Sequence, residues 1–202
     1  MSIELLLRVG KGAGKVGMSE YIAFHKPFGF LSQFTGDDRQ KTLSEFSLPK
    51  DVYAAGRLDK DSEGLLLLSD DGKFIKKLLD PDHGHARVYW VQVEGMPTDK
   101  SLQALARGVT LRGYQTKSCD VRRLDPEPDI PPRDPPIRVR KAIPTCWIEM
   151  TLTEGKNRQV RRMTAAIGHP TLRLIRQKIG LLVLGDLPAG DWRPVKRADI
   201  LP

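Results

Sequence analysis

The feature that most constrains the fold is a run of four leucines at residues 65–68, within "GLLLLS". A strand with one solvated face alternates apolar and polar residues, and this run does not alternate. We therefore predict a strand that is buried on both faces. Immediately before it stands "RLDKDSE", which carries five charges in seven residues. A charged segment thus lies at the entrance to the hydrophobic core, and any account of the chain has to explain it.

The rest of the chain mixes strands and helices without a regular βαβ rhythm. Aromatic and β-branched content predicts strands at residues 21–24, 52–58, 86–95 and 145–155, with further strand structure within 172–187. Capping residues and helical spacing predict a short helix opening at Thr42 and ending before Pro49, and helices over 73–80, after Thr98, and from Gly155 to Gly168. These elements predict the α+β class with a large, mostly antiparallel mixed sheet.

Two segments fall outside this pattern. Residues 1–20 are rich in Gly and Lys, and we expect a flexible N-terminal segment there, with one domain over 21–202. Their glycines lack the spacing of a phosphate-binding loop. Residues 125–144 contain seven prolines, a density that no central strand tolerates, so we predict a long and partly extended loop.

The formal net charge of +8 is concentrated in one stretch. Between residues 138 and 178 there are ten Lys or Arg and two Asp or Glu, while the two signs cancel in the rest of the chain. Such a cluster fits a polyanion partner, and a solvated basic face is an equal alternative. Cys119 and Cys146 indicate neither a metal site nor a disulfide framework, and no membrane span or signal peptide is apparent. We expect a cytoplasmic protein.

Within the basic stretch, Arg158, Arg161 and Arg162 have the i, i+3, i+4 spacing of one helix face. A second face, formed by Val160, Met163 and Ile167, is expected to pack on the sheet. Lys156 adds a cation at the predicted helix start, where the helix dipole disfavours it. Arginine suits bidentate contacts with phosphate, so the pattern favours an anion-binding helix over a merely solvated one.

The charged segment before the leucines admits several interpretations. Its acidic spacing partly resembles a calcium loop, but the four leucines occupy positions where such a loop must continue, so we expect no metal. Asp59 at the rim of the core suits a nucleophilic carboxylate, which would need a nearby cation such as Arg57 or one of the C-terminal arginines. A buried structural Asp–Arg pair explains these residues equally well.

Four motifs occur in a characteristic order: "HKPFG", "GRLDKDSEGLLLLSDDG", "RVYWVQVEG" and "EGKNRQVRRM" followed by "IGHPTLRLIRQKIG". Together they resemble the RNA pseudouridine synthases of the RsuA branch, which modify ribosomal RNA, over residues 21 to about 200. The resemblance implies that Asp59 is the catalytic aspartate. It implies support in the active site from Arg57, Tyr89, Arg161, Lys156 and Leu174, with Tyr89 packing on the uracil and Arg161 pairing with Asp59.

The resemblance also implies a single catalytic domain whose two lobes flank an RNA-binding cleft. Many relatives of RsuA carry an RNA-binding domain of the S4 type, for which the 20 residues before the first motif leave no room. The implied reaction isomerises one uridine of 23S ribosomal RNA, in a stem-loop of naked or early precursor RNA, by a monomer without cofactor. We expect phosphate contacts from Arg158, Arg162, Arg138, Arg140 and Lys141. A non-catalytic RNA-binding or ribosome-assembly protein is the alternative.

Overall fold

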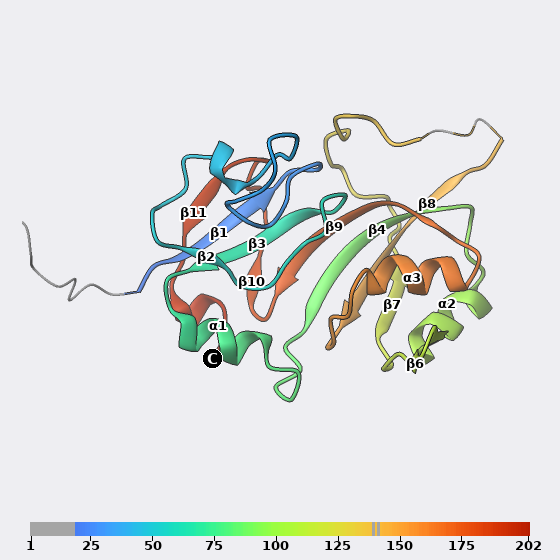
Figure 1. The fold of residues 1–202 in the computed structure, drawn as a ribbon. Coiled ribbons are helices and arrows are strands. Elements are labelled where there is room, and N and C mark those ends of the chain that lie inside the picture. Colours follow the sequence, from blue (N-terminus) through green and yellow to red (C-terminus); the bar gives the residue numbers. More distant parts are fainter. Residues whose placement is uncertain (1–18, 139, 141) are drawn as a thin grey trace, which may run out of the picture.

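The computed structural model describes residues 19–138, 140 and 142–202. The expectation of flexibility at residues 1–20 therefore lies, but for the last two residues, outside the described chain. A nine-stranded sheet crosses this described part from end to end in the order β11-β1-β3-β9-β4-β8-β7, with β2 paired to β3 and β10 to β9 (Figure 1). Its strands are β1 Tyr21–Lys26, β2 Tyr53–Ala54, β3 Glu63–Ser69, β4 Arg87–Glu94, β7 Asp120–Arg123, β8 Thr145–Leu152, β9 Thr171–Ile179, β10 Leu182–Val183 and β11 Trp192–Pro194.

Within the described chain the only parallel pair in this sheet is β3 with β9. The α+β class with a mostly antiparallel sheet is thus confirmed. The parallel pair approaches closely because Gly64, with φ of 102°, faces Arg176 across the ladder, where a Cβ atom would lie 2.4 Å from the Arg176 carbonyl oxygen. This close approach joins the two halves of the sheet beside the charged segment.

The helices are short and pack against the sheet. They are α1 Gly72–Leu79, α2 Asp99–Arg107 and α3 Gln159–Ala166, with 3₁₀ turns η1 Leu43–Glu45 and η2 Arg197–Asp199 and a small hairpin of β5 Thr110–Leu111 and β6 Tyr114–Gln115. Thr98 caps α2 as predicted, accepting a 3.2 Å hydrogen bond from the Ser101 amide. In Figure 1, α1 lies at the β1–β3 end of the sheet, and α2 and α3 lie at the β4–β8 end.

The strand of four leucines is buried along its whole length, as predicted. Leu65 and Leu67 enter one hydrophobic cluster, with α1 and β9, while Leu66 and Leu68 enter another, with β1 and η1. Alternate side chains of a strand point to opposite faces, so β3 needs apolar residues at every position. A third cluster packs β4, β8 and α3, and includes Val160, Met163 and the partly buried Ile167 of the predicted packing face.

Other expectations were wrong in their extent. The strand expected at residues 52–58 is reduced to Tyr53–Ala54, because Gly56 turns the chain with φ of 81°. The helix expected at Thr42 is one 3₁₀ turn, in which the Thr42 hydroxyl accepts from the Ser44 amide. Strands β7 and β11 and the β5–β6 hairpin were not predicted. No helix in the described ranges has the length and apolar content needed to cross a bilayer.

Candidate active site

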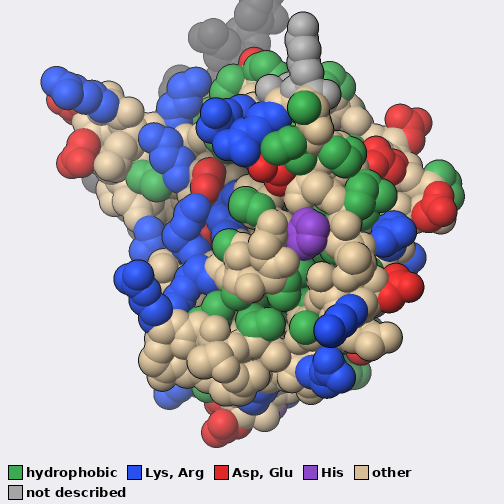
Figure 2. All heavy atoms as spheres, turned by 90° about the vertical axis from the view of Figure 1, so that its right-hand side faces the viewer, with side chains coloured by type: hydrophobic (Ala, Val, Ile, Leu, Met, Phe, Trp, Pro, Cys, Tyr) green, Lys and Arg blue, Asp and Glu red, His purple; other side chains and the backbone are tan. Residues whose placement is uncertain are grey.

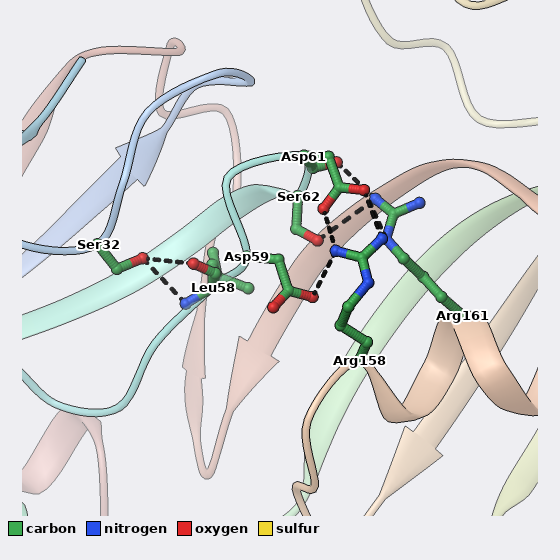
Figure 3. A network of polar contacts seen from close by, with 7 residues as sticks. All are labelled: Ser32, Leu58, Asp59, Asp61, Ser62, Arg158 and Arg161. Atoms are coloured by element: carbon green, nitrogen blue, oxygen red, sulfur yellow. Dashed lines mark hydrogen bonds and ion pairs between the residues drawn. The ribbon is translucent and has the colours of Figure 1, made fainter. Parts of the chain in front are cut away.

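The charged segment forms a loop between β2 and β3, and its position is fixed just before Asp59. The Ser32 hydroxyl donates to the Leu58 carbonyl at 2.8 Å and accepts from the Leu58 amide at 2.9 Å (Figure 3). The Gly29 amide donates to the Lys60 carbonyl at 2.8 Å on the other side. Ser32 and Leu58 are both buried, so Asp59 stands on backbone held from two directions. Sequence reasoning missed Ser32, which lies 26 residues from its partner.

Asp59 and Asp61 face two arginines of the C-terminal motif (Figure 3). The Arg158 guanidinium donates two 2.8 Å hydrogen bonds to the two oxygens of Asp61, and its Nη1 lies 3.7 Å from Asp59 Oδ2. Arg161 lies 3.4 Å from Asp61 through Nε and donates from Nη2 to the Asp61 carbonyl. Asp61 therefore holds both arginines, and Asp59 lies beside this network at one edge.

The pairing expected between Arg161 and Asp59 is therefore wrong in its geometry, because among the described residues the cation within 4 Å of Asp59 is Arg158. The cause is the start of α3. The helix begins at Gln159, and Arg158 precedes it in the left-handed conformation with φ of 50°. Arg158 thus leaves the helix face that it was expected to share with Arg161 and Arg162, and Lys156 lies before the helix.

Charge and burial oppose each other in this network. Burial alone raises the pKa of the Asp61 carboxyl, but the hydrogen bonds and charges of Arg158 and Arg161 outweigh it and lower that pKa. Burial lowers the pKa of Arg161, and the Asp61 charge partly restores it. The Asp61 hydrogen bonds raise the pKa of Arg158. All three groups are ionised at neutral pH.

The predicted support residues meet in one cavity of about 720 Å³, a volume within the range of ligand clefts. Both halves of the sheet contribute: the loop that carries Asp59 from one side, and residues 152–160 before and within α3 from the other. Its walls include the predicted residues Arg57, Asp59, Tyr89, Lys156, Arg158 and Leu174. Arg161 lies behind this wall, against Asp61 and Ser62.

The segment before α3 is held by Gln159, a second residue that sequence reasoning missed. Its side-chain oxygen accepts from the Lys156 amide at 2.9 Å, and its amide nitrogen donates to Glu154. Glu154 also accepts from the Lys117 amide at 2.8 Å. This local network does the work of a helix cap, since the Arg158 side chain at the N-cap is engaged elsewhere. The Lys156 ammonium lies 3.9 Å from the centre of the Tyr114 ring.

Arg176 is the most unusual residue of the cavity wall. It is 3% exposed, and its Nε donates to the Leu65 carbonyl at 2.8 Å, but Nη2 is buried without a hydrogen-bond partner. It pairs with Tyr89 across the β4–β9 ladder, so the two side chains share a face of the sheet. Burial lowers the pKa of Arg176, and Tyr89 opposes that shift. The cavity wall therefore contains a buried cation beside Tyr89.

The expected phosphate-binding residues are spread over several environments. Arg162 lies 5.6 Å from the Tyr114 ring centre, Arg138 is exposed, and Arg140 forms a 2.8 Å ion pair with Glu94. Lys141 lies outside the described residues. Figure 2 shows the end of the molecule that faces right in Figure 1, where Lys and Arg side chains gather along the left of the view.

The site combines a partly exposed carboxylate–arginine network with an open cavity lined by further basic side chains, and other proteins share the fold that carries it. The model of the RNA pseudouridylate synthase family matches residues 20–166, and the chain belongs to this family. It is an RNA pseudouridine synthase of the RsuA branch, an isomerase.

Individual members of the family show high similarity to this chain. The chain is 55% identical over 174 residues to ribosomal large subunit pseudouridine synthase E of Xanthomonas campestris pv. campestris, covering 85% of this chain and 93% of the relative. It is 50% identical over 175 residues to the protein of the same name from Vibrio parahaemolyticus, covering 87% and 73%. A crystal structure of a pseudouridylate synthase superposes with a TM-score of 0.75 at 29% identity, covering 92% and 74%.

Proposed function

We propose that this chain isomerises a specific uridine of 23S ribosomal RNA to pseudouridine, with Asp59 as the catalytic aspartate. One observation carries the choice of Asp59. Of the three carboxylates in residues 59–63, Asp61 accepts both terminal nitrogens of Arg158, and Glu63 accepts two nitrogens of Arg173. Asp59 lies only 3.7 Å from one guanidinium nitrogen, lines the cavity, and has a side chain 31% exposed. It is the carboxylate left available to a substrate.

The reaction rearranges bonds within one nucleotide. The bond from C1′ to N1 breaks, the uracil turns, C5 bonds to C1′, and the C5 proton is lost while N1 gains a proton. Atoms and charges balance, so the isomerisation calls for no second substrate and no cofactor. Asp59 acts as the nucleophile or as the proton acceptor at the reacting centre, and both roles use its ionised form. The neighbouring Arg158 guanidinium compensates that charge.

The other cavity residues divide the remaining work. The uridine has to leave its stack, at a cost of a few kcal/mol. Arg57, exposed at the cavity and bonded to Gln33 at 3.1 Å, holds the distorted backbone. Tyr89 and Leu174 contact the uracil ring, and Lys156 neutralises a phosphate. A target in the loop of an RNA stem-loop costs least to expose, which favours naked or early precursor RNA as the substrate of a cytoplasmic monomer.

Arg176 has an electrostatic role in this proposal. When the C1′–N1 bond breaks, the electron pair moves to the uracil ring, and negative charge spreads over its carbonyl oxygens. A buried guanidinium without a carboxylate partner stabilises such charge strongly, because burial strengthens the interaction and the cation is already in place. Arg176 lines the cavity next to Tyr89, on the side where we place the ring.

Two experiments test the function. Pseudouridine mapping of ribosomal RNA from cells with and without the gene identifies the uridine, and a fragment containing it then serves as substrate for the purified protein. Asp59→Ala should form pseudouridine about 10⁴-fold more slowly while its affinity for RNA stays close to normal, since phosphate contacts come from Lys and Arg. Asp38→Ala, which removes an exposed carboxylate away from the cavity, is the matched control. Turnover near wild type in Asp59→Ala contradicts the assignment.

A further inference from the structure

A second cavity, of about 970 Å³, adjoins the first at Lys60, which lines both. Its walls come from the "HKPFG" turn, the start of β3, the middle of β9 and residues 129–135 of the proline-rich loop. The reaction proposed above uses none of these walls. The catalytic loop thus lies between two cavities.

The walls of this second cavity are held rigidly. Lys26, fully buried, donates from Nζ to the carbonyls of Pro27 at 2.8 Å and Phe30 at 2.7 Å, which fixes the turn. Arg173 donates from Nη1 to the Pro131 carbonyl at 2.8 Å while its other nitrogens bind Glu63. A buried ion pair therefore anchors the proline-rich loop against the sheet. Such bonds pre-organise a binding surface and lower the cost of using it.

The surface so formed carries two cation–aromatic pairs. The Arg133 guanidinium lies 3.9 Å from the centre of the Phe28 ring, and its Nε and Nη2 donate to the carbonyls of Pro135 and Pro136. Lys41 lies 5.3 Å from the centre of the Phe30 ring. Aromatic rings and guanidinium planes are the groups on which unpaired RNA bases stack.

The charges of the two cavities differ. Six Lys or Arg and three acidic residues line the first cavity, whereas five Lys or Arg and four acidic residues line the second. The second cavity is close to neutral and rich in aromatic and proline side chains. A ligand there gains more from stacking than from phosphate neutralisation.

We propose that the second cavity binds an unpaired nucleobase of the same RNA, from a nucleotide that flanks the target uridine. This inference rests on the proposed function and deepens it. The base stacks on the platform of Phe28 and Arg133, while Lys60 contacts the backbone between the two bases. The enzyme thereby recognises a pair of exposed bases, and the second one contributes to the choice of the target.

A double-mutant cycle between protein and RNA tests the proposal. Each nucleotide that flanks the target uridine is replaced in turn by an abasic one, and affinity is measured for wild type, Phe28→Ala and Arg133→Ala. With wild type, one flanking position should lose affinity about tenfold when its base is removed. In either variant the intact RNA should bind about tenfold more weakly, and removing that base should have no further effect. The abasic effect should change little with salt, since it does not involve phosphate.

Matched controls and outcomes separate this proposal from the function on which it rests. Tyr53→Ala removes an aromatic side chain that is 66% exposed outside both cavities, and should bind every RNA as wild type does. Melting temperatures establish that the variants are folded. If wild type modifies the fragment but the abasic and protein effects simply add, the second site is wrong and the proposed function stands. If both cavity variants bind RNA normally, the cavity serves another partner and the inference fails. If wild type forms no pseudouridine, the proposed function itself fails.

Discussion

Arg173 and Arg176 lie three residues apart on β9, and both are buried, yet their surroundings differ. Arg173 donates to both oxygens of Glu63, at 2.9 and 2.8 Å, and to the Pro131 carbonyl. Arg176 has one hydrogen bond, to the Leu65 carbonyl, and a buried Nη2 without a partner. No carboxylate of the described chain forms an ion pair with it.

The difference shows how one strand can serve stability at one point and chemistry at another. Burying a charge costs several kcal/mol unless a partner and hydrogen bonds offset the cost. Glu63 offsets it for Arg173, and each of the three guanidinium nitrogens of Arg173 has a partner within the protein. No carboxylate of the described chain offsets this cost for Arg176. Its guanidinium can therefore form a strong interaction with a negatively charged substrate.

The largest expected effect concerns the buried ion pair of Arg173 and Glu63. Arg173→Met leaves the Glu63 carboxylate buried without its partner, and the free energy of unfolding should fall by about 3–5 kcal/mol. Urea denaturation measures this value. The double variant Glu63→Met/Arg173→Met removes both charges and should recover most of the loss. A single variant as stable as wild type would show that the pair contributes little and that the contrast with Arg176 has no energetic basis.

Lys26 is a third buried cation, and its effect on stability should depend on pH. Lys26 is fully buried with two carbonyl partners, and burial lowers the pKa of its ammonium from 10.5 to about 8. The unfolded chain therefore binds more protons than the folded one between these values, and stability rises with pH across that interval. The full shift corresponds to about 3 kcal/mol.

The measurement is a comparison of wild type with Lys26→Met. Between about pH 7.5 and about pH 10, the free energy of unfolding of wild type should rise by about 2–3 kcal/mol relative to the variant. Cys119 and Tyr21, whose pKa values burial raises, act in the opposite direction, but both proteins contain them and the difference cancels them. Parallel stability profiles would mean that the Lys26 ammonium loses no proton in this range. If Lys26→Met does not fold, direct NMR titration of the Lys26 amine decides the same point.

The buried pair also marks the limit of what the sequence could predict. The leucine run predicts a doubly buried strand, because its apolar content leaves no solvated face. Most of the residues that the motifs point to line the cavity, and Arg161 lies behind its wall. The partners within that cluster were not predictable, since Glu63 and Arg173 are 110 residues apart and the choice between Asp59 and Asp61 depends on the turn before α3.

That turn shows why local rules failed. Helical spacing placed Arg158 on one face with Arg161 and Arg162, but the left-handed conformation of Arg158 redirects its side chain to Asp61. Likewise, β7 has mostly exposed polar residues and forms because β8 offers it an edge. The charge count of the basic stretch also overstates the exposed positive charge, since it includes the buried Arg173 and Arg176.

Replacing Arg176, which has no carboxylate partner, should affect catalysis without lowering stability, the opposite of replacing Arg173. Arg176→Met removes a buried charge with no carboxylate partner, so the free energy of unfolding should stay the same or rise, while kcat falls about 10²-fold with KM nearly unchanged. Arg176→Lys keeps the charge and should recover part of the rate. The combination to look for is a normal melting temperature with a slow chemical step. Strong destabilisation with normal kcat in the folded fraction would place Arg176 beside Arg173 as a structural residue.

The smallest expected effect concerns two surface arginines, Arg158 and Arg162, and the salt dependence of RNA binding. Arg158 and Asp61 neutralise each other, whereas Arg162 forms no ion pair with any described residue and lies beside Tyr114. Each phosphate contact contributes about 0.7–0.9 to the slope of log K against log salt. Arg162→Gln should therefore make the slope shallower by about that amount, and Arg158→Gln by clearly less, with the same uridine modified. Lys50→Gln, an exposed cation outside the basic stretch, should leave the slope unchanged. Equal changes for Arg158 and Arg162 would mean that RNA displaces Asp61 from Arg158 on binding, and that this pair, unlike that of Arg173, opens during function.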